Sequence, residues 1–102
     1  MRAAFVCALL LAAPLAATAQ DANSGRNLAA TCAICHGTDG RPVPNAPVIP
    51  LAGVPRDFIA SQMRAFRDGK QPATVMHQIA KGYSDEQIRL IAAFFAAQPA
   101  KQ

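Results

Sequence analysis

The second half of the chain repeats apolar residues with the period of an α-helix. Over residues 56–68 the apolar face would consist of Phe58, Ile59, Met63 and Phe66. From Ser84 to just before Pro99 the pattern recurs, and its apolar face would consist of Ile88, Ile91, Ala92 and Phe95. Two amphipathic helices are therefore predicted in this half.

Start and stop signals add two further helices. Ser84 and Gln87 form an S-x-x-Q capping box, which predicts that the last helix starts here. A first helix is predicted over about residues 22–35, and a short one over about residues 72–81, with Pro72 in its first turn. No stretch reads convincingly as a strand, so the predicted fold is all-α.

A long proline-rich stretch separates the first helix from the others. Residues 37–55 contain Pro42, Pro44, Pro47, Pro50 and Pro55, together with Gly37, Gly40 and Gly53. Neither a helix interior nor a central strand tolerates so many prolines. An irregular loop of this length in a small domain usually wraps a ligand or is disordered.

The first nineteen residues have the composition of a secretory signal. Arg2 provides the positive start, residues 3–15 are almost entirely apolar, and residues 17–19 (Ala-Thr-Ala) give a small-x-small cleavage site. The apolar run is shorter than the ~20 residues of a membrane span. We predict cleavage of residues 1–19, export to the periplasm and no membrane insertion afterwards; an uncleaved anchor is the alternative.

Residues 20–102 are sufficient for one small domain. A chain this short buries only ~60% of its unfolded surface and is marginally stable unless something adds to its core. The chain has no Trp, and only Cys32 and Cys35 remain after the signal, so no disulfide framework is available. A large apolar cofactor would supply the missing core. The basic residues are scattered, without a basic run or aromatic platform, which argues against nucleic acid as a partner.

One motif carries specific chemistry. Cys32-Ala33-Ile34-Cys35-His36 is the C-x-x-C-H pattern of c-type haem attachment. Two thiols at this spacing can reach the two vinyl groups on one porphyrin edge, and the adjacent imidazole can then face the iron. The sequence therefore predicts one covalently bound haem c, held by Cys32 and Cys35, with His36 as an iron ligand.

Other uses of a C-x-x-C pair fit the chain less well. A structural zinc site needs four ligands at suitable spacing, and His77 is the only other histidine. A thioredoxin-like redox pair needs a βαβ context, which the helical pattern does not provide.

A haem iron that transfers electrons usually has a second axial ligand. Met76 lies between the second and last predicted helices, from where it can approach the haem on the side opposite His36. Met63 and His77 are the alternatives. Met63 also fits the apolar face of its helix, and His77 would give bis-histidine ligation. An open iron site is the remaining alternative.

The chain after the signal resembles the class I cytochrome c domain. The matching segments are A-x-x-C-x-x-C-H-G-x-x-G at residues 29–40, L-A-G at 51–53, Q-M-x-x-F-R-D-G-K at 62–70, V-M-x-x-I-A-K-G-Y-S-D-E-Q-I at 75–88 and I-A-A-F-F at 91–95. The resemblance implies three to five helices around one haem, with His36 and Met76 as iron ligands. It also implies that a loop proline, here Pro47, presents its carbonyl to His36.

The implied crossing of the first and last helices involves specific side chains. In the class I fold these helices pack across one another, and here the contact would place Gly25 and Leu28 against Ile91 and Phe94.

Within this family, residues 66–70 and 73–84 look most like the haem subunit of flavocytochrome c sulfide dehydrogenase. The resemblance implies an FAD-containing partner subunit that oxidises sulfide, with electrons passing from flavin to haem and on to a soluble acceptor such as another cytochrome. The haem subunit would have no substrate chemistry of its own. The alternatives are an autonomous cytochrome shuttle between redox enzymes and, with an open iron site, a haem sensor or peroxidase.

Overall fold

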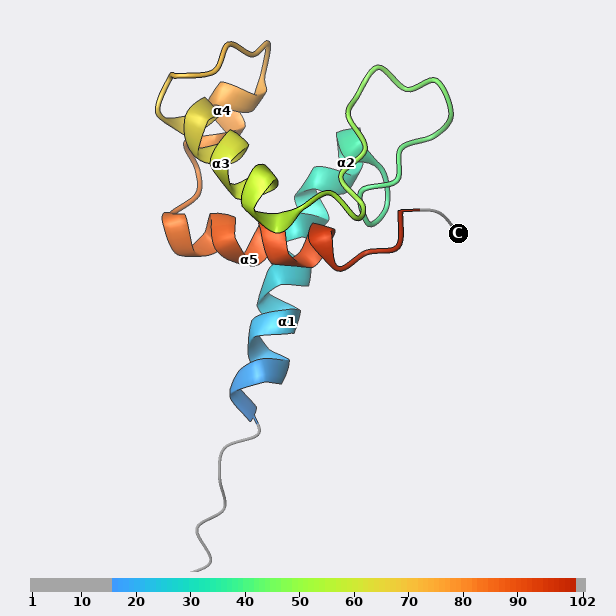
Figure 1. Cartoon of the computed structure of the whole chain (residues 1–102), viewed down its shortest axis with the longest axis vertical. Helices are drawn as coiled ribbons and strands as arrows, with labels where there is room; N and C mark the ends of the chain where they lie inside the picture. Colours follow the sequence, from blue (N-terminus) through green and yellow to red (C-terminus); the bar gives the residue numbers. More distant parts are fainter. Residues whose placement is uncertain (1–15, 101–102) are drawn as a thin grey trace, which may run out of the picture.

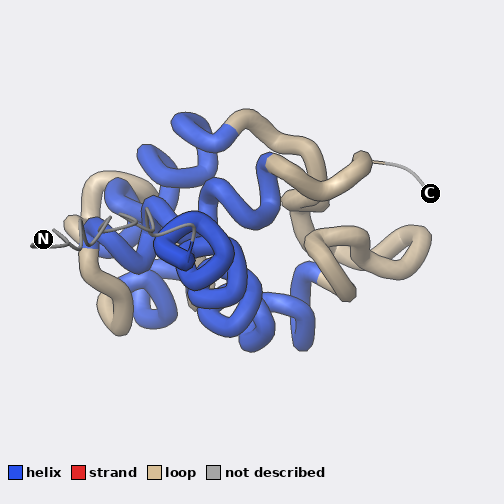
Figure 2. Tube along the Cα trace, turned by 90° about the horizontal axis from the view of Figure 1, so that it is seen from below, coloured by secondary structure: helices blue, strands red, loops and turns tan. Residues whose placement is uncertain are grey.

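The fold consists of short helices joined by loops, as the apolar periodicity predicts. The structure of the chain, a computed structural model, describes residues 16–100. Its elements in chain order are α1 (Ala16–Ala29), the 3₁₀ turn η1 (Ala30–Cys32), α2 (Ala33–His36), α3 (Arg56–Arg67), α4 (Met76–Ala80) and α5 (Asp85–Ala96) (Figure 1). Residues 16–100 form no strand, and one isolated bridge joins Thr38 and Arg41 (Figure 2). The predicted all-α class is confirmed.

Helices α1 and α5 cross at close range (Figure 1). A Cβ atom added to Gly25 would lie 2.8 Å from the carbonyl oxygen of Leu90 and 3.5 Å from Cβ of Phe94. Only glycine leaves room for two helix backbones to approach this closely. The predicted crossing of Gly25 against Phe94 is confirmed, and Leu28 packs on the core cluster that contains Ile91.

The core lies where α3 and α1 pack on α5. Ile88, Ile91 and Phe95 of α5 are at most 1% exposed, and Met63 of α3 is 6% exposed. The rest of this cluster is Ala29, Ile59, Ala60 and Ala92. The predicted face of α5 therefore lies in the core, as do Ile59 and Met63 of α3, but Phe58 is 56% exposed and Phe66 is only partly buried, so that part of the predicted α3 face is wrong.

Helix α5 begins at the predicted capping box. The hydroxyl of Ser84 accepts a hydrogen bond from the backbone N–H of Gln87 at 3.2 Å, and the Gln87 side chain accepts one from the Ser84 N–H at 2.9 Å. Helix α3 also keeps its predicted bounds within one residue, and Gly69, with φ +74°, follows its last turn.

Two predicted boundaries are wrong. The first helix starts at Ala16 instead of residue 22, because the alanine-rich segment before residue 22 has high helix propensity, and it gives way to the 3₁₀ turn η1 after Ala29. The short helix starts at Met76 instead of Pro72. Thr74 and Val75 are β-branched, and Val75 is extended with φ −140°, so the helix forms only after them.

The predicted signal lies mostly outside the described residues. Residues 1–15 are not among them, and residues 16–19 form the first turn of α1. Within residues 16–100, no helix has the length and apolar character that crossing a membrane requires.

The helix crossing makes a testable prediction. Gly25→Ala should lower the free energy of unfolding by about 1–3 kcal/mol, because the new methyl group would overlap a backbone oxygen that cannot rotate away. This cost exceeds the helix-propensity gain of alanine, which is about 1 kcal/mol. Guanidinium unfolding of the haem-loaded protein, followed by far-UV circular dichroism, measures the change.

Gly82→Ala is the matched control. A Cβ at Gly82 would meet its nearest neighbour, the Ile79 carbonyl oxygen, at an ordinary 3.4 Å, and Gly82 is not among the glycines with positive φ. Its stability should change by less than about 1 kcal/mol, in the stabilising direction. Equal losses in the two variants would contradict the close crossing.

Candidate functional site

The C-x-x-C-H motif occupies one continuous helical segment. Cys32 ends η1, and Cys35 and His36 belong to α2. Cys32 is half-buried and packs against the core cluster, whereas Cys35 is exposed. The helix ends at Gly37, whose φ of +81° favours glycine, and a Cβ there would collide with the Arg41 carbonyl group. One helical turn thus presents two free thiols and an imidazole.

His36 has a fixed orientation. Its Nδ1 lies 2.8 Å from the carbonyl oxygen of Ile49. A carbonyl oxygen can only accept, so Nδ1 must carry the proton and donate it in this hydrogen bond. The lone pair of Nε2 is then free to bind a metal, as in most histidine ligands.

The predicted acceptor of this hydrogen bond is wrong. The family resemblance implies that Pro47 presents its carbonyl to His36, but the acceptor belongs to Ile49, which directly precedes Pro50. The reason lies in the turn that follows, where the carbonyl of Gly40 accepts hydrogen bonds from the N–H groups of Leu51 and Ala52 at 2.9 and 3.1 Å. These bonds draw residues 49–52, and not Pro47, back to the motif.

The loop over residues 37–55 is fastened at both ends to the region of α5. Near its start, Nε of Arg41 donates to the carbonyl oxygen of Pro99 at 2.8 Å. Near its end, the N–H of Gly53 donates to the carbonyl oxygen of Phe95 at 2.9 Å. The position of the Ile49 carbonyl therefore depends on the C-terminal end of the fold.

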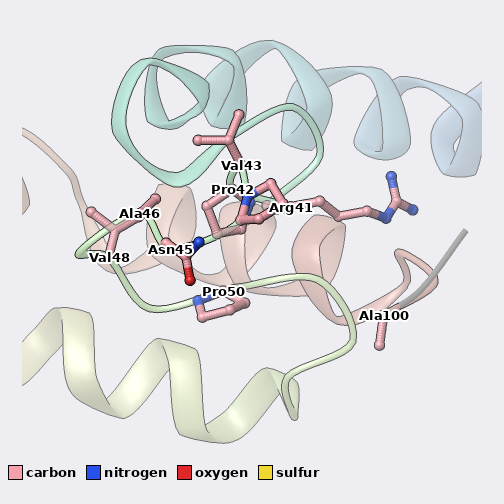
Figure 3. A pocket seen from close by; sticks show the side chains of 10 residues that line it. Arg41, Pro42, Val43, Asn45, Ala46, Val48, Pro50 and Ala100 are labelled. Atoms are coloured by element: carbon pink, nitrogen blue, oxygen red, sulfur yellow. The ribbon is translucent and has the colours of Figure 1, made fainter.

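A cavity of about 390 Å³ lies within this loop, next to Ala100 (Figure 3). Most of its lining comes from residues 40–50, with Arg41 and Asn45 as the polar side chains. Cys32, Cys35, His36 and Met76 are all absent from its lining. The cavity is therefore separate from the residues that the sequence singles out.

The three candidates for a second ligand lie in different surroundings. Met63 is buried in the core cluster, among Ile59 and Ile88. Met76 is partly exposed and is the first residue of α4. His77, the next residue, has a buried Nδ1 without a hydrogen-bond partner in the part of the chain that the structure describes.

Helices α2 and α4 stand on the same side of α5 (Figure 1). The hydroxyl groups of Thr31 and Tyr83 lie 3.1 Å apart, so the residues just before the motif contact the residues just after α4. The structure thus brings Cys32, Cys35 and His36 together on one segment and links that segment to the one that carries Met76.

No family model matches the chain, but curated relatives do. Cytochrome c-554(548) of Halomonas halodenitrificans is 40% identical over 84 residues, which cover 78% of this chain and 99% of the relative. The chain belongs to the class I c-type cytochromes. The cofactor of this cytochrome is covalently bound haem c, and its function is electron transfer.

Other relatives in the family are longer than this chain. Cytochrome c4 of Pseudomonas aeruginosa is 41% identical over 85 residues, covering 82% of this chain but only 41% of the relative. The cytochrome subunit of sulfide dehydrogenase of Chlorobaculum tepidum is 42% identical over 72 residues, covering 70% of this chain and 63% of the relative. The chain therefore spans less than two thirds of these two relatives.

The residues of this cytochrome fit a haem c. Both thiols are free, and the hydrogen bond from Nδ1 of His36 leaves Nε2 as the ring nitrogen available to iron. Several large apolar side chains beside these residues are exposed, notably Ile49, at 72%, and Val75, next to Met76. A porphyrin is a large apolar ring that such side chains can cover. When bound, haem c supplies an iron that changes its oxidation state by one electron.

Sequence reasoning missed two contacts of this site. The Ile49 carbonyl has no signature, because every residue carries one. The contact between Thr31 and Tyr83 joins residues that are far apart in the sequence. The Y-S-D-E-Q segment resembles the family pattern, but nothing in it points to Thr31.

The two thiols should differ in reactivity before haem is attached. Burial raises the pKa of the Cys32 thiol, so less thiolate forms there at neutral pH, and its side chain is half-covered. In haem-free protein, iodoacetamide should therefore modify Cys35 several-fold faster than Cys32, and the Cys32 rate should rise as the pH approaches its pKa. Peptide mass spectrometry of timed samples measures both rates, and faster modification of Cys32 would contradict the described packing.

Proposed function

We propose that Cys32 and Cys35 bind haem c through thioether bonds and that His36 and Met76 are its two axial ligands. The observation that carries this proposal is the hydrogen bond from Nδ1 of His36 to the Ile49 carbonyl, which leaves Nε2 as the only free ring nitrogen. The thiols on the same helical turn support it, because their spacing suits two attachment points on one porphyrin edge.

The surroundings of the three candidates favour Met76 as the second ligand. The burial of Met63 among Ile59 and Ile88 accounts for that methionine as part of the core. His77 has its Nδ1 buried without a partner, and a histidine that ligates iron usually donates a hydrogen bond from its other nitrogen. Met76 is partly exposed, and its segment contacts the motif region through Tyr83 and Thr31.

Two protein ligands suit a protein that only transfers electrons. With His36 and Met76 both bound, no coordination position is open to a substrate or gas, and methionine raises the reduction potential relative to a second histidine. The chain's part is to hold both ligands in place and to limit access of water. An open-site sensor or peroxidase would need Met76 to be absent from the iron.

As a partner, we propose an FAD-containing sulfide dehydrogenase subunit that donates electrons to this haem. The likeness of residues 66–70 and 73–84 to such haem subunits supports it, as does the 42% identity to the sulfide dehydrogenase cytochrome of Chlorobaculum tepidum. Electrons would leave to a soluble acceptor such as another cytochrome. A second candidate is an autonomous shuttle, which is favoured by the match to 99% of cytochrome c-554(548).

We also propose that the protein works in the periplasm after export. The supporting feature is the signal-like composition of residues 1–19, with cleavage near Gln20. Residues 20–102 would then form a single mono-haem domain. Mass spectrometry of the mature protein tests this directly, since it reports both the new N-terminus and the mass of one attached haem.

The ligand assignment is tested by comparing two methionine variants. Met76→Ala should abolish the weak far-red absorption band that a methionine–iron bond gives oxidised haem, and it should lower the reduction potential. Met63→Ala should keep the band but lower the free energy of unfolding by about 2–5 kcal/mol, because it removes a buried side chain. Persistence of the band in Met76→Ala would contradict the assignment.

The partner is tested by purification from the natural host. A C-terminally tagged chain should retain a flavin-containing protein in low salt, and the isolated complex should reduce its haem when sulfide is added without oxygen. The same tag on an unrelated exported protein controls for capture by the tag alone, since it should retain no flavoprotein. A tagged chain that purifies alone and whose haem sulfide does not reduce would favour the shuttle.

A further inference from the structure

One ion pair joins the two helix ends that flank the segment carrying Met76. Nη1 of Arg67, the last residue of α3, donates to Oδ1 of Asp85, the first residue of α5, at 2.7 Å. The same guanidinium donates from Nε to Asp68 at 3.0 Å, and this hydrogen bond lowers the pKa of the Asp68 carboxyl. The planar group thus joins two helix ends that residues 68–84 separate in the sequence.

Few other hydrogen bonds fix this segment. Near its start, the N–H groups of Lys70 and Gln71 both donate to the carbonyl oxygen of Ala65, and near its end Tyr83 contacts Thr31. Between these points, residues 72–79 make no hydrogen bond to any described residue outside the segment. Packing adds to these contacts, since α4 lies against α3, Ala80 is fully buried and Tyr83 packs on the core cluster.

We infer that Arg67 is a positioning residue for the distal haem ligand: by holding Asp85, it keeps the segment that carries Met76 closed. The inference rests on the proposed assignment of Met76 to the iron. Joining the ends of a loop removes open conformations that would otherwise compete with the closed one. Isolated exposed ion pairs contribute little. Asp85 is 73% exposed, but the Arg67 side chain is only 23% exposed, and two of its three nitrogens donate to carboxylates.

A neighbouring ion pair provides a matched control. Glu86 also lies in the first turn of α5, and it pairs with Arg89 of the same helix at 2.6 Å. Neutralising Asp85 or Glu86 removes one favourable charge from the same helix N-terminus. Only the loss of Asp85 releases the ends of the segment, so the difference between the two variants isolates that effect.

The experiment titrates the oxidised, haem-loaded protein with imidazole at low ionic strength and mildly alkaline pH, where imidazole is neutral and competes with methionine for iron. Binding is read from the loss of the far-red band. Arg67→Gln and Asp85→Asn should each raise the apparent imidazole affinity about two- to fivefold, as expected for a released ion pair. The double variant should add little to either, Arg67→Lys should restore part of the effect, and Glu86→Gln should match the wild type.

A second arm measures how imidazole binding depends on salt. Because salt screens a partly exposed pair, added sodium chloride should raise the imidazole affinity of the wild type towards that of Arg67→Gln, and it should have little effect on Arg67→Gln itself. This measurement tests the inference even if a variant fails to acquire haem. If the imidazole affinity of the wild type does not change with salt, the inference is overturned.

The outcomes separate two failures. If Arg67→Gln and Asp85→Asn bind imidazole like Glu86→Gln, Arg67 does not position the ligand, although Met76 can still bind iron. If Met76→Ala keeps the far-red band, the ligand assignment itself is wrong. Unfolding midpoints of all variants, from far-UV circular dichroism, show whether a change in imidazole affinity merely follows a change in global stability.

Discussion

The close approach of α1 to α5 at Gly25 fixes the frame to which the other elements attach. A side chain at this position would reach the Leu90 carbonyl, so the spacing of the two helices depends on a hydrogen atom in place of a methyl group. Helix α1 leads directly into η1 and α2, which carry the C-x-x-C-H motif. Helix α5 provides the core face on which α3 packs. The crossing thereby sets where the motif lies relative to the rest of the core.

Helix α5 also helps to position both proposed iron ligands. Its C-terminal end holds the loop that orients His36, through the Gly53–Phe95 hydrogen bond and the contact of Arg41 with Pro99. Its first residue, Asp85, takes the ion pair from α3 across the segment that carries Met76. One helix of twelve residues therefore links the two ligand-bearing segments, which lie far apart in the sequence.

Structural features that depend on only a few neighbouring residues were predictable from the sequence. The Ser84–Gln87 capping box is of this kind, and so are the motif at Cys32–His36 and the apolar face of α5. For α3 the pattern located Ile59 and Met63 in the core but also included the exposed Phe58. Helix boundaries that depend on the path of the chain were not predictable, as the start of α4 at Met76 shows.

Long-range contacts were the least predictable part of the site. The acceptor for His36 is a backbone carbonyl thirteen positions away, and the Arg67–Asp85 pair joins residues eighteen positions apart. Neither contact produces a local pattern, because its partners come together only when the whole chain has folded.

The Ile49 carbonyl has an evolutionary consequence. Because the acceptor for His36 is a main-chain atom, most substitutions of Ile49 leave it in place. The orientation of the His36 imidazole should therefore survive most substitutions of Ile49. The proposed ligands themselves have no such protection, because His36 and Met76 would each bind through a side chain that one substitution removes.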